Sequence, residues 1–236
     1  MDQLAPLLGG KAVIMLTRSQ CIAPDVPLET QIEVVFRALK VSPDERAAVL
    51  AFLEPLRVKD PITHDHYEHS LRVGLVGERI GRFMHLDSKA LFYAGMLHDT
   101  GKCQTPLETL GKKEGWSEQD AAVVSEHVMD SYRMIKGRFN FTAEIVLLHH
   151  RFQAAGYPAR LPPFLREYNE GAKMMIKLCG YLLALADVYD ALHRADNRNV
   201  PGRELDEAEI KAKMLEYFAD QRVLVQDLYE AGIFIG

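Results

Sequence analysis

The chain has 236 residues, of which 48% are hydrophobic and 26% are charged, and its formal net charge is −5. These values are typical of an ordinary globular protein with one substantial core. The net negative charge argues against a nucleic-acid polymer as partner. It is compatible with the binding of a small anion in a locally positive cleft. Three cysteines without CxxC spacing, no N-terminal signal and no long uncharged apolar run predict a cytoplasmic protein without disulfides or a membrane span.

Helical periodicity dominates the chain. An early apolar stripe (Ile32, Val35, Phe36, Leu39) is expected to face the core, with a homodimer surface as the alternative. Ser42 followed by Pro43 predicts a helix start, and Ser88 and Ser117 are expected to cap two later helices. The expected helices cover 41–56, 69–83, 87–99, 117–135, 142–150, 171–194, 205–219 and 220–230. Only residues 11–17 read as a strand, and they fit a buried helical turn equally well.

The connections between these helices predict the organisation of the chain. Loops are expected at 100–116, 153–170 and 195–204, and binding residues concentrate in loops held by a rigid scaffold. The sequence therefore predicts an all-α fold. It divides into a helical N-terminal region, 1–60, and a main domain, 61–236, packed as one globular unit.

The positions of the histidines are unusual. His69 is expected to begin a helix, His98 to end one beside Asp99, His127 to lie within one, and the pair His149–His150 to end another. Asp187 falls inside the most apolar predicted helix of the chain, where an unpaired carboxylate is very costly. A bound metal would compensate it, and imidazoles with carboxylates and no thiolate suit Fe, Mn, Zn, Co or Ni. In a regular helix His149 and His150 would point about 100° apart, favouring two metals or a metal and a substrate.

Five motifs follow one another in the order HSLRV (69–73), HDTGK (98–102), His127, HH (149–150) with GYP (156–158), and ADVYDAL (186–192). Together they resemble the HD-GYP branch of the HD phosphohydrolase superfamily, over residues 64 to 194. The resemblance implies an all-α helical bundle with a multinuclear metal site in its core. Two or three divalent ions, usually iron or manganese, are expected there.

The resemblance also assigns roles to individual residues. It implies that the metal ligands are His69, His98, Asp99, His127, His149, His150 and Asp187. Asp99 would bridge the metals and Lys102 would contact the scissile phosphate. The substrate implied is a cyclic dinucleotide, typically cyclic di-GMP, attacked by a metal-bridging hydroxide. Asp65 matches a third-metal position only loosely, and a helix-start carboxylate is its alternative interpretation.

The layer expected to contact substrate departs from the family pattern. The loop reads HHRFQAAGYP, with Arg151 in place of a glutamate and without a DG pair. Arg194 and Arg198 are displaced candidates for a substrate arginine, and Tyr157 of the GYP motif is a third expected contact. Arg151 is a candidate for binding phosphate, or else a helix-end arginine bonded to carbonyls.

Other residues receive structural interpretations. We expect no site role for the remaining histidines, His64, His66, His85 and His193. Trp116 is interpreted as a loop or lid residue, with base stacking as the alternative.

Three functions fit these motifs. The leading one is a metal-dependent phosphodiesterase acting on a cyclic dinucleotide. The second is a broader HD-type nucleotide phosphohydrolase, favoured if the altered GYP loop no longer shapes a dinucleotide pocket. The third is a non-catalytic nucleotide-binding signalling module, against which the complete set of ligand positions argues.

Overall fold

The computed structural model describes residues 26–112, 114–153, 156–194 and 203–234, and every regular element within these ranges is a helix. The prediction of an all-α fold is confirmed for this part of the chain. The elements are α1 (Leu28–Ala38), α2 (Pro43–Lys59), α3 (Pro61–Phe83), α4 (Ser88–Leu97), η2 (Thr100–Gln104), α5 (Leu107–Leu110), α6 (Glu118–Ser125), α7 (His127–Ile135), α8 (Asn140–Val146), α9 (Glu170–Leu192), α10 (Glu207–Tyr217), η3 (Ala219–Gln221) and α11 (Arg222–Glu230). The ambiguous segment 11–17 and Arg198 lie outside the described residues.

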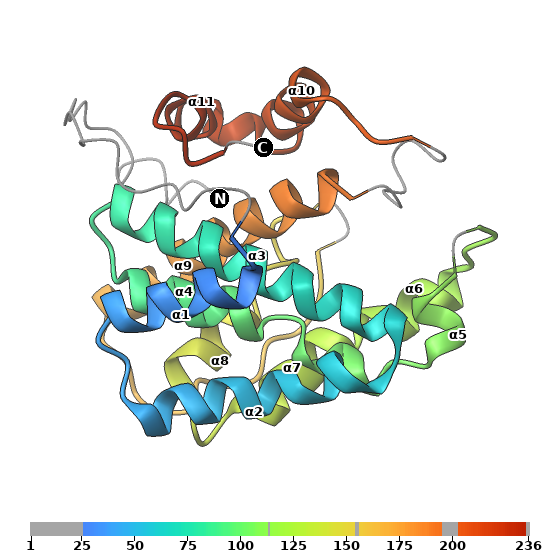
Figure 1. Cartoon of the computed structure of the whole chain (residues 1–236), viewed down its shortest axis with the longest axis horizontal. Helices are drawn as coiled ribbons and strands as arrows, with labels where there is room; N and C mark the ends of the chain where they lie inside the picture. Colours follow the sequence, from blue (N-terminus) through green and yellow to red (C-terminus); the bar gives the residue numbers. More distant parts are fainter. Residues whose placement is uncertain (1–25, 113, 154–155, 195–202, 235–236) are drawn as a thin grey trace.

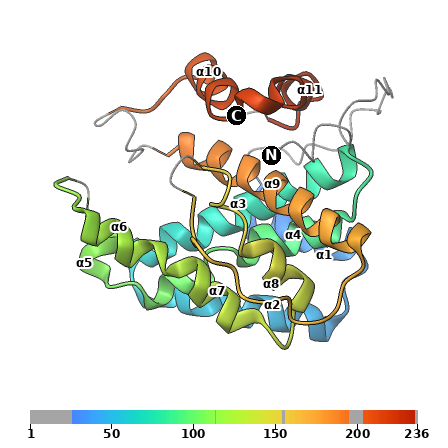
Figure 2. The same cartoon turned by 180° about the vertical axis from the view of Figure 1, so that it is seen from behind.

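Helices α3 and α4 lie at the centre of the bundle. Helices α1 and α2 pack on one side of this pair, and α8 and α9 pack on the other, as opposite views show (Figures 1 and 2). Helices α10 and α11 form a further layer beyond α9, and α5 with α6 projects from one end of the molecule (Figure 1). Among the helices described, none is both long and apolar enough to cross a membrane.

The N-terminal helices are part of the packed core. Ile32, Val35 and Phe36 of α1 are buried, so the stripe faces inward, as the preferred interpretation predicted. Ser42 caps α2 through a capping box with Glu45, and Pro43 is its first residue, as expected. Helix α2 packs directly on α3, and a division of the chain at residue 60 stays a prediction.

Several element boundaries differ from the sequence prediction. Helix α3 begins at Pro61 rather than at residue 69, because Asp60 caps it and proline fits the first helical position. Asp87, not Ser88, caps α4. The expected loop 100–116 contains η2 and α5, and the expected helix 117–135 is divided into α6 and α7 at Glu126.

Helix α8 also ends earlier than predicted, at Val146, so that His149 and His150 lie in turns. A histidine ring bonds to a helix carbonyl at this ending and at the break before α7. The ring of His127 bonds to the carbonyl of Val124, and the ring of His149 bonds to that of Val146. A ring nitrogen that takes a helix carbonyl competes with the next backbone N–H of the helical ladder.

Close packing of α4 on α3 brings the ends of these helices into register. A Cβ atom added at Gly95 of α4 would lie 2.6 Å from the backbone nitrogen of Gly74 and 2.6 Å from the carbonyl oxygen of Val73, both in α3. Real Cβ atoms do not approach backbone atoms so closely. Helix α4 can therefore contact α3 backbone to backbone only because residue 95 lacks a side chain, and this contact places His98 beside His69.

We predict that Gly95→Ala destabilises the protein by about 1–3 kcal/mol, the usual cost of overpacking a core, because α4 must move away from α3. Thermal unfolding checks this as a decrease of several degrees in the midpoint. Gly171→Ala is the matched control, since a Cβ there meets only the Asn169 side chain at 3.5 Å. Equal midpoints for the two variants would show that the contact between α3 and α4 does not need a glycine.

Candidate metal centre

The seven predicted ligand residues come together in the core of the bundle. His69 comes from α3, His98 and Asp99 follow α4, His127 begins α7, His149 and His150 follow α8, and Asp187 comes from α9. They form three overlapping groups, within each of which the ligand atoms lie within 4.8 Å of one another. The groups are His127 with His149 and His150, His69 with His98 and Asp99, and His98 with His149 and Asp187. Six of the seven residues are buried and His150 is half-buried.

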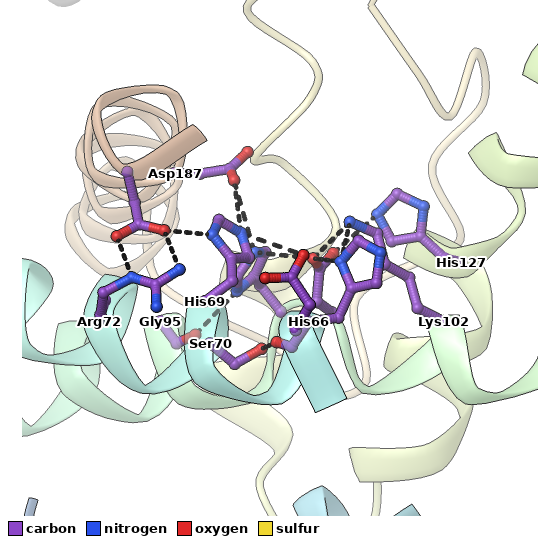
Figure 3. Close-up of polar contacts among 12 residues, drawn as sticks. His66, His69, Ser70, Arg72, Gly95, Lys102, His127 and Asp187 are labelled. Carbon is purple, nitrogen blue, oxygen red and sulfur yellow. Dashed lines mark hydrogen bonds and ion pairs between the residues drawn. The ribbon is translucent and has the colours of Figure 1, made fainter. Parts of the chain in front are cut away.

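Asp99 lies between the histidines of this cluster. Its Oδ1 atom is 3.1 Å from Nε2 of His127, and its Oδ2 atom is 3.6 Å from Nε2 of His69 and 3.5 Å from Nε2 of His98. On the cavity side, Oδ2 is 2.5 Å from Nζ of Lys102 (Figure 3). Burial raises the pKa of Asp99, but the neighbouring His98, Lys102 and His127 hold it well below its usual value. Asp99 is therefore a carboxylate with an oxygen on each side of the cluster.

Three of the histidines are oriented by the same backbone contact. In each case Nδ1 lies within hydrogen-bond distance of the carbonyl oxygen three residues earlier: His98 to Gly95 at 2.8 Å, His127 to Val124 at 2.5 Å, and His149 to Val146 at 2.7 Å. Because a carbonyl can only accept, the proton sits on Nδ1. The lone pair of a neutral ring is then on Nε2, the atom that points into the cluster.

His69 is oriented by a side chain instead. Its Nδ1 atom is 2.7 Å from Oδ2 of Asp190, whose other oxygen accepts a hydrogen bond of 2.7 Å from Nε of Arg72 (Figure 3). The Nε2 atom of His69 is 3.1 Å from Oδ1 of Asp187. Burial lowers the pKa of His69, but the hydrogen bonds to Asp187 and Asp190 outweigh it and raise the pKa to about 9. The carboxylates thus favour positive charge at this point of the core.

The cluster contains buried polar atoms that satisfy one another poorly. Both carboxylate oxygens of Asp99, Nε2 of His98, His127 and His149, and Nδ1 of His150 are buried and make no well-formed hydrogen bond to the described part of the chain. Unsatisfied buried polar groups are rare because each costs about 1–3 kcal/mol. Divalent cations would satisfy these imidazoles and carboxylates together, so the residues fit a metal site. The number and identity of the ions stay predictions.

His149 and His150 are arranged differently from the expectation for adjacent helical residues. Because they lie in turns, their rings are close, with centroids 4.1 Å apart, and both belong to one group with His127. His149 turns Nε2 inward, whereas the buried partnerless nitrogen of His150 is Nδ1. The inference that they need separate partners depended on a regular helix, and that premise was wrong.

A cavity of about 700 Å³ opens onto the cluster. Besides the cluster residues His69, His127, His150 and Asp187, it is lined by three of the predicted substrate contacts, Lys102, Tyr157 and Arg194. The Tyr157 ring stacks on His150, with centroids 4.5 Å apart.

Arg151 and Asp65 do not line this cavity. Arg151 donates to the carbonyls of Pro158 and Ala159 at 2.6 and 3.2 Å and does not line the cavity, in keeping with its alternative interpretation. Its role in substrate binding stays a prediction. Asp65 forms an ion pair with Arg194 and belongs to none of the three groups.

The residues His66, Asp190 and Arg72 lie beside the predicted ligands but were not among the predicted site residues. We expected no site role for His66 and a helix that begins at residue 69, but α3 includes His66 and only 8% of its surface is exposed. Its Nδ1 atom lies 3.4 Å from Nζ of Lys102 and 3.9 Å from Asp99 (Figure 3). Burial holds the pKa of His66 well below its usual value.

A common spacing could have identified the missed residues. His66 precedes His69 by three positions, and Arg72 follows it by three; Asp190 likewise follows Asp187 by three. Residues at this spacing share a helix face.

Trp116 donates a hydrogen bond to the Lys112 carbonyl at 2.8 Å and does not line the cavity, as expected of a loop residue.

An all-helical bundle with a buried cluster of histidines and aspartates is typical of a class of metal-dependent enzymes. The sequence pattern of the HD domain family matches residues 66–192, more than half of the chain, and the chain belongs to this family. The predicted membership of the HD superfamily is confirmed.

Several curated proteins are similar in sequence to part of this chain. The chain is 31% identical over 136 residues to the 3'3'-cGAMP-specific phosphodiesterase 1 of Vibrio cholerae, covering 55% of this chain and 29% of that protein. It is 29% identical over 159 residues to the cyclic di-GMP phosphodiesterase response regulator RpfG of Xanthomonas campestris, covering 65% of this chain and 39% of that protein. It is 35% identical over 112 residues to a cyclic di-GMP phosphodiesterase of Vibrio cholerae, covering 43% of this chain and 21% of that protein. The chain thus spans well under half the length of each of these relatives.

We predict that Asp190→Asn weakens metal binding about 10–100-fold, the usual effect of losing a partner that orients a ligand histidine. The amide retains the size of the side chain but no longer attracts the Nδ1–H group of His69 as a carboxylate does. Competition with a chelator, followed by metal analysis, measures the affinity. Glu207→Gln is the control, because Glu207 pairs with His193 outside the cluster. Unchanged affinity in Asp190→Asn would contradict the orienting role of Asp190.

Proposed function

We propose that this protein is a metal-dependent phosphodiesterase that hydrolyses a cyclic dinucleotide of the cyclic di-GMP type. The observation that carries the proposal is the buried cluster of partnerless imidazole nitrogens around Asp99, which opens onto a cavity lined by Lys102. Three relatives whose names state cyclic-dinucleotide phosphodiesterase activity support the choice of substrate. Two or three divalent ions, iron or manganese, are proposed as cofactors, held by the seven predicted ligands.

Each side chain around the cavity has a distinct proposed part. Divalent ions in such a site supply Lewis acidity toward a phosphoryl oxygen and make water more acidic. Lys102, with its ammonium 2.5 Å from Asp99 and on the cavity wall, would neutralise a non-bridging phosphate oxygen. Tyr157 and Arg194 would contact the rest of the substrate, the tyrosine held in place by its stacking on His150.

A broader nucleotide phosphohydrolase is the second candidate, and one observation favours it. The loop that carries GYP is held by Arg151, which bonds to the carbonyls of Pro158 and Ala159 instead of lining the cavity. A cavity without that arginine has fewer positive groups for a second phosphate. A binding module without turnover is the third candidate, and it predicts protein that is purified without bound metal.

The substrate is tested by incubating reduced, metal-loaded protein with cyclic di-GMP, 3'3'-cGAMP and bis(4-nitrophenyl) phosphate. The proposal expects hydrolysis of at least one cyclic dinucleotide with a higher kcat/KM than for the generic diester, because only the nucleotides contact the cavity walls. Chromatography of the products and metal analysis of the same sample give the two readouts. Hydrolysis of bis(4-nitrophenyl) phosphate alone would contradict the proposal and favour the broader nucleotide phosphohydrolase.

We further predict that Lys102→Ala lowers kcat by about 100-fold or more while the metal content stays unchanged. The ammonium is expected to stabilise charge on phosphate, as single charged donors in active sites do, without binding the cation itself. Steady-state kinetics and metal analysis of the same preparations check both parts. Lys173→Ala, which removes a lysine paired with Glu170 at the start of α9, is the control. Loss of metal in Lys102→Ala would contradict this role of the lysine.

A further inference from the structure

The C-terminal helices contribute a wall of the cavity that lies outside the family match. Residues 66–192 carry the HD pattern, whereas α10, η3 and α11 follow it in sequence. These helices form a layer beside α9 (Figures 1 and 2). Glu216, Tyr217 and Phe218, at the junction of α10 and η3, line the same cavity as Lys102 and His150. The cavity therefore has a side that the HD motifs do not specify.

This wall is firmly attached to the rest of the bundle. The Phe218 ring meets the Tyr181 ring of α9 edge to face with centroids 5.7 Å apart, and the Tyr181 hydroxyl donates to Asp220 at 3.3 Å. Near the other end of the layer, the rings of Phe234 and Tyr189 are stacked with centroids 4.3 Å apart. Phe218 is therefore an anchor, and the residue before it is held at a fixed place on the cavity edge.

Tyr217 differs from its neighbour in exposure. Phe218 is 5% exposed, whereas Tyr217 is 44% exposed although it lines the cavity. Nζ of Lys213 lies 5.8 Å from the centre of the Tyr217 ring, within the range of a cation–π contact, which restrains the ring. An aromatic ring kept partly exposed on a fixed cavity wall is suited to stacking on a flat ligand.

The chemistry of the cavity is divided between its walls. Lys102, His66 and the cluster histidines supply polar surface suited to a phosphate, and Phe152, Tyr217 and Phe218 supply aromatic surface. Its volume of about 700 Å³ falls within the usual range for small-molecule sites. A nucleotide requires this division, because its phosphate is anionic and its base is a flat ring that stacks on aromatic side chains.

We propose that the α10–η3–α11 layer is a base-binding wall of the active site and that Tyr217 stacks on a nucleobase of the substrate. The proposal rests on the function proposed above and adds to it a selectivity residue outside the family motifs. Tyr217 contributes to binding of the base. The protein therefore binds nucleotides more tightly than phosphate compounds that lack a base.

The test compares two probes that differ only in the base. GMP and ribose 5-phosphate are titrated calorimetrically into the metal-loaded full chain. We expect Tyr217→Ala to weaken GMP binding about tenfold, the scale of one base–aromatic stack, and to leave ribose 5-phosphate binding unchanged. Tyr217→Phe should bind GMP like the unsubstituted protein, because the ring is retained.

The controls separate base stacking from a structural effect. Val223→Ala alters a residue of α11 that is 70% exposed and does not line the cavity, and it should change neither affinity. The proposal is overturned if Tyr217→Ala weakens both probes equally, if it weakens neither, or if the unsubstituted protein binds them with equal affinity. Failure of the proposed function appears separately, as absence of cyclic-dinucleotide hydrolysis in a protein that still discriminates the two probes.

Discussion

The hydrogen bond from a ring Nδ1–H to a carbonyl three residues earlier is the contact on which this site depends. It occurs at His98, His127 and His149, each at or just beyond a helix end, where backbone carbonyls lack helical partners. The same contact fixes the tautomer, directs Nε2 into the core and accompanies the end of the regular helix. Local backbone structure and metal-binding chemistry are therefore one feature at these three positions.

The buried carboxylates complete this arrangement. Asp99 and Asp187 face the histidines, and Asp190 with Arg72 holds His69 from behind. Burial opposes the ionised form of each carboxylate, yet their pKa values lie below the usual range because cationic and hydrogen-bonding groups surround them. A site that holds several acids in ionised form inside the core is electrostatically prepared for cations.

Much of the fold and of the buried cluster could be predicted from the sequence, and each feature that could not has an identifiable physical cause. The all-α fold follows from helical periodicity, and the residues that gather in the buried cluster are those that the family resemblance implied as ligands. Helix α3 starts before the expected residue 69 because Asp60 caps it and Pro61 occupies its first position, and the buried His66 lies in this earlier part. The turn at His149 and His150 could not be predicted, since it depends on a ring-to-carbonyl contact that periodicity does not encode. The wall supplied by α10 needs tertiary packing, which short motifs do not contain.

The close approach of α3 and α9 in the bundle has a consequence for how the protein is made. His69 and Asp190, which are in direct contact, are separated by 121 positions in the chain. Contacts of high sequence separation carry a loop-closure cost that must be met before they stabilise the fold. During synthesis, a growing chain that has not yet reached α9 holds most of the histidines but neither Asp187 nor Asp190. Assembly of the centre is thus postponed until nearly the whole HD region has left the ribosome.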